Sequence, residues 1–152
     1  MIIDRPPYAY RQDPAVPPFD DQGPIVFIDG SCTLCSQSAK LLIRMDRAKE
    51  FRICPVQSPT GRAVLSHFGL AADDPTSWLY LHEGRAYGSM EAVIRAGTRL
   101  GGAGHALKVL RLLPRPAQDW LYRQVAQNRY RLFGRADLCS MPDPAVKARL
   151  MD

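Results

Sequence analysis

Two cysteines three residues apart, Cys32 and Cys35, are the side chains in this sequence best suited to carry out a reaction. The apolar run at 25–28 before them predicts a short buried strand, which ends in the turn Asp29-Gly30. From Cys32 onward, apolar residues recur at helical spacing. The pattern therefore predicts a thiol pair at a strand-to-helix turn, with Cys32 at the N-terminus of the helix.

The expected position of Cys32 favours the reactive form of a thiol. The first N–H groups of a helix have no partner within it and, together with the helix dipole, they stabilise an anion. Cysteines at such positions have pKa values lowered from about 8.5 to between about 3.5 and 7.5, and the thiolate is the nucleophile. Cys35 lies one helical turn later, on the same face. These positions predict that Cys32 attacks a disulfide and that Cys35 resolves the product.

The carboxylate of Asp29, three residues before Cys32, has two interpretations. It could take the proton from the Cys32 thiol, although a nearby negative charge would also raise the pKa of that thiol. Alternatively, it accepts hydrogen bonds from N–H groups of the loop and holds the Gly30-Ser31 turn. Both interpretations stay open, and Asp29 is a candidate catalytic residue beside the two cysteines.

The size and composition are those of one globular domain. The chain has 152 residues, of which 46% are hydrophobic and 23% charged, as in ordinary folded proteins. It contains no apolar stretch of roughly 18 residues for a membrane span, and residues 1–24 lack the apolar core of a signal peptide. We therefore expect a cytoplasmic protein, with an exported form as the alternative. In a reducing compartment, four cysteines favour redox or metal chemistry over structural disulfides.

The predicted elements follow the order of the thioredoxin fold, an α/β fold, here a βαβ-α-ββα core with additional C-terminal helices. A helix at 32–47 between strands at 25–28 and 51–54 makes a βαβ unit, whose strands should run parallel. Ser58 is expected to cap the second helix and Ser89 the third. The other predicted elements are the helix at 59–68, a hairpin of strands at 78–81 and 85–87, a helix from 89 to about 100, and helices at 104–113 and 117–133.

Four segments are expected along the chain: a Pro-rich arm at 1–24, the thioredoxin-like core at 25–100, a helical extension of the same domain at 101–142, and a tail at 143–152. The arm is either disordered or laid over the domain by its aromatic residues.

Residues 101–152 hold nine Lys and Arg against four Asp and Glu, so the net charge of +5 lies at this end. Such a patch can attract nucleic acid, anionic lipid or acidic proteins. A solvated helix face is the commoner explanation, and nucleic acid is not expected as a partner.

Asp29, Cys32 and Cys35 form an Asp-x-x-Cys-x-x-Cys motif. In this motif the chain resembles the DCC-type thiol-disulfide oxidoreductases, which are named for it. The resemblance covers roughly residues 24–142. It implies a thioredoxin-like fold and disulfide exchange, but no particular substrate. The other segments that carry it are Pro55-Val56-Gln57-Ser58, Ser89 at the start of the third helix, Leu112-Leu113-Pro114-Arg115-Pro116, and Asn128-Arg129-Tyr130-Arg131-Leu132-Phe133-Gly134 followed by Cys139.

The sequence departs from thioredoxins at two places that concern substrate binding. Thioredoxins often carry a proline between the two cysteines, where this chain has Thr33 and Leu34. They also have a cis proline before the third strand, where the nearest residue here is Pro75, followed by Thr76. The bond before Pro75 is either such a cis peptide or part of a plain loop, in which case the 74–78 loop would supply other backbone. These four residues are the predicted substrate-binding residues.

The sequence favours a thiol-disulfide oxidoreductase that acts on a protein or small-molecule disulfide. It would use no cofactor beyond its own redox-active disulfide and would be regenerated by a thiol reductant. One alternative is a structural zinc site of Cys32, Cys35, Cys54 and Cys139, against which the strand position expected for Cys54 argues. Another is a non-catalytic thioredoxin-like binding module that uses the basic C-terminal helices. Cys54 by itself is interpreted as a small core residue, and Cys139 as either a third redox thiol or an inert buried one.

Overall fold

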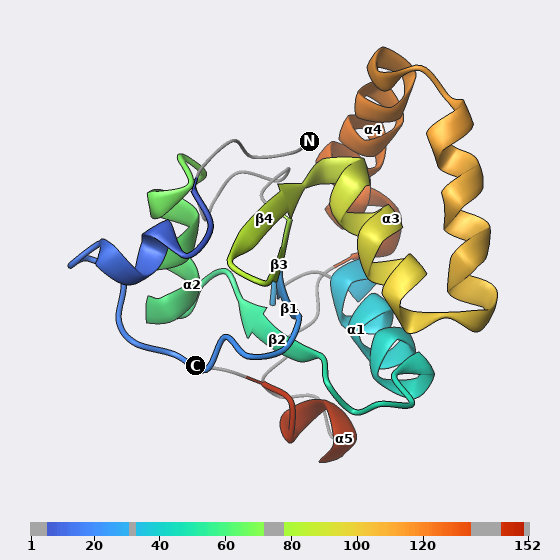
Figure 1. Ribbon diagram of the computed structural model, residues 1–152. Coiled ribbons are helices and arrows are strands. Elements are labelled where there is room, and N and C mark those ends of the chain that lie inside the picture. Colours follow the sequence, from blue (N-terminus) through green and yellow to red (C-terminus); the bar gives the residue numbers. More distant parts are fainter. Residues whose placement is uncertain (1–5, 31–32, 72–77, 135–143, 151–152) are drawn as a thin grey trace.

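A four-stranded mixed sheet forms the centre of the molecule (Figure 1). The computed structural model describes residues 6–30, 33–71, 78–134 and 144–150. The strands are β1 (Ile25–Ile28), β2 (Arg52–Pro55), β3 (Leu79–His82) and β4 (Arg85–Gly88), in the spatial order β2-β1-β3-β4. β1 runs parallel to β2 and antiparallel to β3, which pairs antiparallel with β4. The predicted parallel pair and the predicted hairpin are both confirmed.

The helices complete the predicted order. α1 (Thr33–Met45) connects β1 to β2, α2 (Pro59–His67) follows β2, and α3 (Ser89–Leu100) follows β4. The C-terminal part adds the 3-10 helix η2 (Gly102–Leu112), α4 (Arg115–Phe133) and the short α5 (Pro144–Lys147). The chain therefore has the predicted thioredoxin-like α/β architecture with additional C-terminal helices. Within the described ranges, no helix is both long and apolar enough to cross a lipid bilayer.

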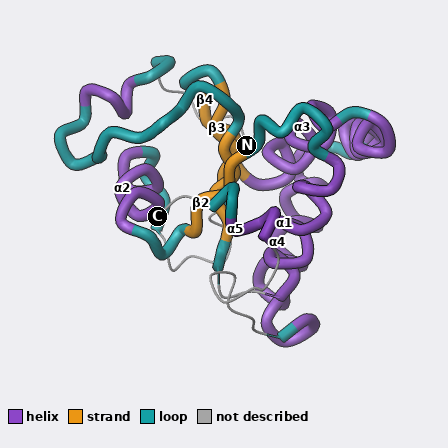
Figure 2. The backbone as a smooth tube through the Cα atoms, turned by 90° about the horizontal axis from the view of Figure 1, so that it is seen from below, coloured by secondary structure: helices purple, strands orange, loops and turns teal. Residues whose placement is uncertain are grey.

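Side chains on the two faces of the sheet build two separate apolar clusters. Because successive side chains of a strand point to opposite faces, Val26 and Ile28 pack with α1 and α3, whereas Ile25 and Phe27 pack with α2. Figure 2 shows the same division, with α2 on one side of the sheet and α1, α3 and α4 on the other. The helix that carries Cys35, α1, thus belongs to a layer that packs on one face of the sheet only.

The starts of two α-helices differ from the sequence prediction, and the helix predicted at 104–113 is the 3-10 helix η2, which begins at Gly102. The predicted capping position of α3 is wrong, because Ser89 is its first helical residue and Gly88, with extended backbone, occupies the cap. β4 passes into α3 through Gly88 and leaves no residue between them for a side-chain cap. α4 begins at Arg115, two residues before the predicted start at 117, since Pro116 is tolerated in the first helical turn. Ser58, in contrast, caps α2 as predicted and accepts the N–H of Gly61 at 3.0 Å.

The described part of the N-terminal arm, residues 6–24, is docked on the domain rather than separate from it. Tyr10, in the 3-10 helix η1 (Ala9–Gln12), is 1% exposed and joins the α2-side cluster. Its hydroxyl donates to Asp21 at 2.6 Å, and the guanidinium of Arg11, which also donates to Asp21, holds the pKa of that carboxyl below its usual range. Aromatic docking, one of the two alternatives for the arm, is therefore confirmed for these residues.

A hairpin turn gives the arm its second point of attachment. Glu83 and Gly84 join β3 to β4 with φ values of 51° and 76°, as in the tight turns that suit twisted hairpins. The N–H of Tyr8 donates to the carbonyl of Gly84 at 3.1 Å. A Cβ atom at Gly84 would lie 2.6 Å from the Tyr8 nitrogen, so both the conformation and this close approach require glycine.

The C-terminal segment 144–150 packs against β2, a contact that the sequence did not predict. Val146 in α5 is fully buried, and the Ile53 N–H donates to the Arg149 carbonyl at 2.9 Å. Ile53 and Leu150 form an isolated parallel bridge. A four-residue helix is too short to produce a periodic apolar pattern. The sequence therefore predicted only a tail for this segment.

Replacing Leu42 by alanine is expected to lower the free energy of unfolding by about 2–5 kcal/mol, because it removes a buried side chain from α1 and leaves a cavity. Leu42 is 8% exposed and lies in the α1-side cluster. Urea melts measure the change. The neighbouring Leu41 is 58% exposed, so Leu41→Ala is the matched control and should change stability by less than about 0.5 kcal/mol. Equal effects of the two substitutions would contradict the orientation of α1.

Candidate functional site

Asp29 directly follows β1 and is buried, with 7% of its surface exposed. Two side chains donate to its carboxylate. The Gln57 amide nitrogen lies 2.6 Å from Oδ1, and the Tyr130 hydroxyl donates to Oδ2. Gln57 belongs to the loop between β2 and α2, and Tyr130 to α4. A carboxylate inside the fold requires such partners, so Asp29 joins three distant parts of the chain.

Gln57 also fixes the first residue of the turn that follows Asp29. Its side-chain oxygen accepts the N–H of Gly30 at 3.0 Å, while its side-chain nitrogen donates to Asp29. The Gln57 carbonyl in turn accepts from the Arg62 side chain at 3.0 Å. The Gln57 side chain, which comes from another loop, therefore holds the turn by binding both the Gly30 N–H and the Asp29 carboxylate.

The C-terminal end of α4 lies on the N-terminal end of α1. The N–H of Thr33, the first residue of α1, donates to the carbonyl of Gly134 at 3.3 Å. Gly134 ends α4 with φ of 79°, a left-handed conformation that favours glycine. Together with the hydrogen bond from Tyr130 to Asp29, this contact places α4 across the start of the helix that carries the cysteine motif.

Cys35, the second cysteine of the motif, lies on the buried side of α1. It is 8% exposed and packs in the cluster that includes Ala39 and Leu42, with Leu34 against the same cluster. It also lines an apolar groove of about 700 Å³ between α1, α3, η2 and α4. The thiol of Cys35 is thus protected from bulk water, yet it forms part of the wall of an open cavity.

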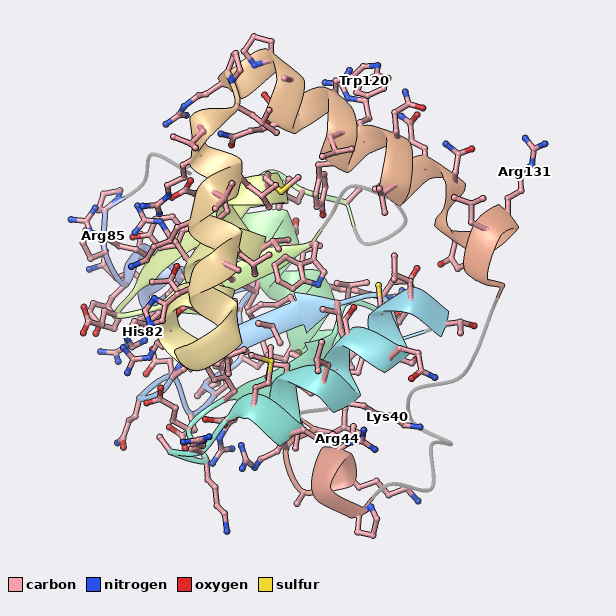
Figure 3. All side chains as sticks on the ribbon, turned by 90° about the vertical axis from the view of Figure 1, so that its right-hand side faces the viewer. Lys40, Arg44, His82, Arg85, Trp120 and Arg131 are labelled. Carbon is pink, nitrogen blue, oxygen red and sulfur yellow. The ribbon has the colours of Figure 1, made fainter. Side chains whose placement is uncertain are left out.

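The groove is almost entirely apolar. Figure 3 views the molecule from the side on which α1, η2 and α4 surround it. Its volume falls in the range of small-molecule and cofactor sites, which are mostly apolar with a few polar groups. The residues that line it are Leu34, Cys35, Ser38, Leu41, Leu42, Met45, Trp78, Met90, Val93, Ala96, Gly97, Leu100, Leu107, Leu110, Leu121, Tyr122, Val125 and Ala126.

The structure brings together only part of the predicted site. Asp29, Thr33, Leu34 and Cys35 lie around the β1–α1 junction, and Leu34 lines the groove with Cys35. The other predicted site residues lie outside the described residues. These residues are Cys32, Pro75, Thr76 and Cys139. The peptide bond before Pro75, which was expected to be either cis or part of a plain loop, lies outside the described residues too.

Cys54 is a core residue, as predicted. It is fully buried in the α2-side cluster, and its sulfur lies 3.4 Å from the Ser58 hydroxyl. Cys35 belongs to the cluster on the opposite face of the sheet. Two side chains separated by the sheet do not meet at one metal ion, which removes a ligand from the four-thiolate zinc alternative.

The sequence interpretation did not assign a role to Gln57 or Tyr130. Both stood in segments that carry the family resemblance, Pro55 to Ser58 and Asn128 to Gly134. Each segment supplies one hydrogen bond to Asp29. Their occurrence together with the Asp29 motif was therefore the sequence signal that could have identified Gln57 and Tyr130.

The substitution Tyr130→Phe is expected to lower the free energy of unfolding by about 1–3 kcal/mol, because the buried Asp29 carboxylate loses one of its donors. Tyr87→Phe, which removes a hydroxyl on β4 at the far edge of the sheet from β2, is the matched control. It should change stability by less than about 0.5 kcal/mol. Urea melts distinguish the two. If Tyr130→Phe is as mild as its control, the hydrogen bond to Asp29 does not hold α4 in place.

Comparison with known proteins points to one family. The sequence profile of the family described as DCC1-like thiol-disulfide oxidoreductase matches residues 26–135. A DCC family protein of Arabidopsis thaliana, described as chloroplastic, is 34% identical over 123 residues, which cover 80% of this chain and 72% of the relative. The uncharacterized protein YuxK of Bacillus subtilis is 29% identical over 127 residues, covering 84% of this chain and 93% of the relative. No solved structure matches. This match covers most of the chain, and the sheet order and the thiol motif at the start of α1 agree with it. The chain therefore belongs to the DCC1-like thiol-disulfide oxidoreductase family.

Proposed function

We propose that this protein exchanges disulfides through Cys32 and Cys35. The observation that carries the proposal is the position of Cys35, which is buried on the inner side of α1 but forms part of the wall of an open groove. A resolving thiol needs protection from solvent and access to the attacking sulfur. Cys32 immediately precedes Thr33, the first residue of α1, where the helix dipole favours a thiolate.

The reaction proceeds in two exchanges. The Cys32 thiolate attacks one sulfur of the substrate disulfide, forms a mixed disulfide and releases the other substrate sulfur as a thiolate, which takes up a proton. The Cys35 thiolate then attacks the Cys32 sulfur, so that the second substrate sulfur leaves and a Cys32–Cys35 disulfide remains. The substrate is reduced by two electrons and the protein is oxidised by two. A dithiol reductant restores the starting state by the same two steps in reverse.

Asp29 serves in this proposal as the anchor of the motif rather than as its base. Each of its two oxygens already accepts a hydrogen bond from a side chain, one from Gln57 and one from Tyr130. These bonds support the turn that leads from β1 into α1. We propose that Thr33 and Leu34 present the motif to the substrate, with Pro75 and Thr76 as the facing backbone, and that Cys139 is either a third redox thiol or a structural residue.

The second candidate function is a binding module without turnover, favoured by one observation, the apolar groove between α1 and α4. A groove of this kind can bind an apolar ligand whether or not the cysteines react. The two functions differ in the behaviour of Cys32, because only exchange requires an activated thiol.

In the Cys35→Ser variant, the pKa of Cys32 is expected to lie below the value of about 8.5 of an ordinary thiol, because Cys32 precedes the first turn of α1. The rate of alkylation by iodoacetamide as a function of pH measures it, with Cys32 identified by peptide mass spectrometry. The same measurement on the unfolded variant in urea gives the ordinary thiol as control. A folded-state midpoint at or above about 8.5 would overturn activation of Cys32 and with it the proposed exchange.

A further inference from the structure

Exposed apolar side chains of this protein are concentrated on η2 and α4. Eight large hydrophobic residues are exposed among the described residues, and seven of them lie between 109 and 132. The most exposed are Leu112 at 84%, Leu132 at 67%, Val109 at 64% and Trp120 at 62%. Single exposed apolar residues are common on protein surfaces, but a concentration of them indicates a site that binds a protein, a membrane or a ligand.

The excess of positive over negative charge lies in the segment that forms the same two helices. Residues 102–134 contain six Lys and Arg and one acidic residue, Asp119, a balance of +5, whereas the remaining residues contain fourteen of each kind. Lys108, Arg123 and Arg131 are all exposed. In Figure 3, Trp120 and Arg131 both point away from the body of the molecule along α4. By sequence, an excess of +5 falls in the segment that carries the exposed apolar residues, and one of its cations, Arg111, pairs with Glu91 of α3 at 3.2 Å.

We infer that exposed side chains of η2 and α4, here called the η2–α4 face (Val109, Leu112 and Trp120 with Lys108, Arg123 and Arg131), dock on an anionic lipid bilayer. Apolar side chains enter the acyl boundary of a bilayer to a depth of about 5–10 Å, while Lys and Arg bind the anionic headgroups, and tryptophan favours the interface. Each cation near an anionic leaflet contributes about 1 kcal/mol. The inference is independent of thiol exchange, because no cysteine takes part in it.

The charge and shape of the face favour a bilayer over a second copy of the chain. Two copies docked through this face would oppose two segments of the same positive charge. The side chains are spread over two helices at the outer edge of the molecule, beyond α3 (Figure 1). A fluid bilayer accepts such side chains one by one, without a matching shape. No helix among the described residues is apolar enough to span, so the η2–α4 face is expected to lie on the surface.

Docking in this way would place lipid at the edge of the apolar groove. Leu41, Leu121 and Val125 line the groove and are also among the exposed hydrophobic residues. The groove therefore opens next to the proposed lipid contact, and Cys35 lies in its wall. An apolar molecule dissolved in the bilayer would reach the groove without crossing water.

The test is co-sedimentation of the full chain with vesicles of phosphatidylcholine, alone or mixed at about three to one with phosphatidylglycerol. We expect binding to the anionic vesicles only, weakened by added salt. Arg123→Glu/Arg131→Glu should lower the partition coefficient at least about tenfold, and Leu112→Ser by about tenfold. In a Trp78→Phe protein, Trp120 is the only tryptophan left, and its emission should shift to the blue with anionic vesicles.

A matched control separates this face from net charge. Arg47 and Arg85 are exposed, and Figure 3 shows Arg85 on the opposite side from Arg131. Arg47→Glu/Arg85→Glu changes the net charge equally and should keep most of the binding, and Cys35→Ser should bind like the wild type. Equal losses in the two double variants would overturn the inference, as would no loss for Leu112→Ser. A dimer in light scattering that Leu112→Ser dissociates would assign the face to a second copy and overturn it too.

Discussion

Cys35→Ser is expected to lose disulfide-reducing turnover completely and to accumulate a covalent adduct with its substrate. Cys32 can still attack, but the mixed disulfide that forms has no internal thiol to resolve it. With oxidised glutathione as the probe, the adduct is one glutathione on Cys32, detected by intact-protein mass spectrometry. The loss is the largest activity change that we expect from a single substitution, because it removes one of the two exchanging sulfurs.

Cys54→Ala is the control for this experiment. Cys54 is fully buried on the other face of the sheet from Cys35, so its replacement is expected to reduce stability and to keep turnover. Measurements are made below the melting temperature of both variants. If Cys35→Ser turns over like the wild type, or if Cys54→Ala also accumulates the adduct, Cys35 is not the resolving thiol.

Asp46→Ala is expected to lower the free energy of unfolding by about 3–5 kcal/mol, the largest stability effect that we expect from a single substitution. The Asp46 side chain is 2% exposed and pairs with Arg149 at 2.8 Å. It also accepts the N–H of Phe51 at 2.9 Å. Its removal leaves the 16% exposed Arg149 without its partner carboxylate and the Phe51 N–H without an acceptor. Urea melts give the change.

The control is an aspartate in an exposed ion pair. Asp20 and Arg52 lie 3.1 Å apart with 47% and 49% of their side chains exposed, so Asp20→Ala should cost about 0–1 kcal/mol. A double substitution, Asp46→Ala with Arg149→Ala, should cost less than the sum of its parts, because the two residues share one contact. If Asp46→Ala is as mild as Asp20→Ala, the pair of Asp46 with Arg149 does not hold residues 144–150 on the domain.

The central layer of the fold was predictable because its signals are local. The apolar run at 25–28 and the helical spacing after Cys32 predicted β1 and α1, and Ser58 with Pro59 predicted the start of α2. The cap of α3 was predicted wrongly, since a serine before an apolar stripe has the same pattern whether it caps the helix or begins it. α5 was not predicted, because four residues are too few to show helical apolar spacing; its buried residue, Val146, packs in the α1-side cluster.

The candidate site was predictable in part for the same reason. Asp29 and Cys35 stand in one short motif, and their positions follow from the strand-to-helix turn. Gln57 and Tyr130 lie 28 and 101 residues from Asp29 in sequence, and no local pattern reveals which distant donors a buried carboxylate will receive. The groove likewise depends on how η2 packs against α3 and how α4 packs against α1 and α3, and sequence periodicity does not specify such packing between helices.

The most direct test of disulfide exchange through Cys32 and Cys35 is thiol counting with metal analysis on protein purified without reductant. Peptide mapping identifies which cysteines are bonded, before and after treatment with dithiothreitol. Exchange predicts a Cys32–Cys35 disulfide that dithiothreitol opens and oxidised glutathione restores, with no stoichiometric zinc. Cysteines that stay reduced in the presence of oxidised glutathione, or zinc bound at one per chain, would contradict it.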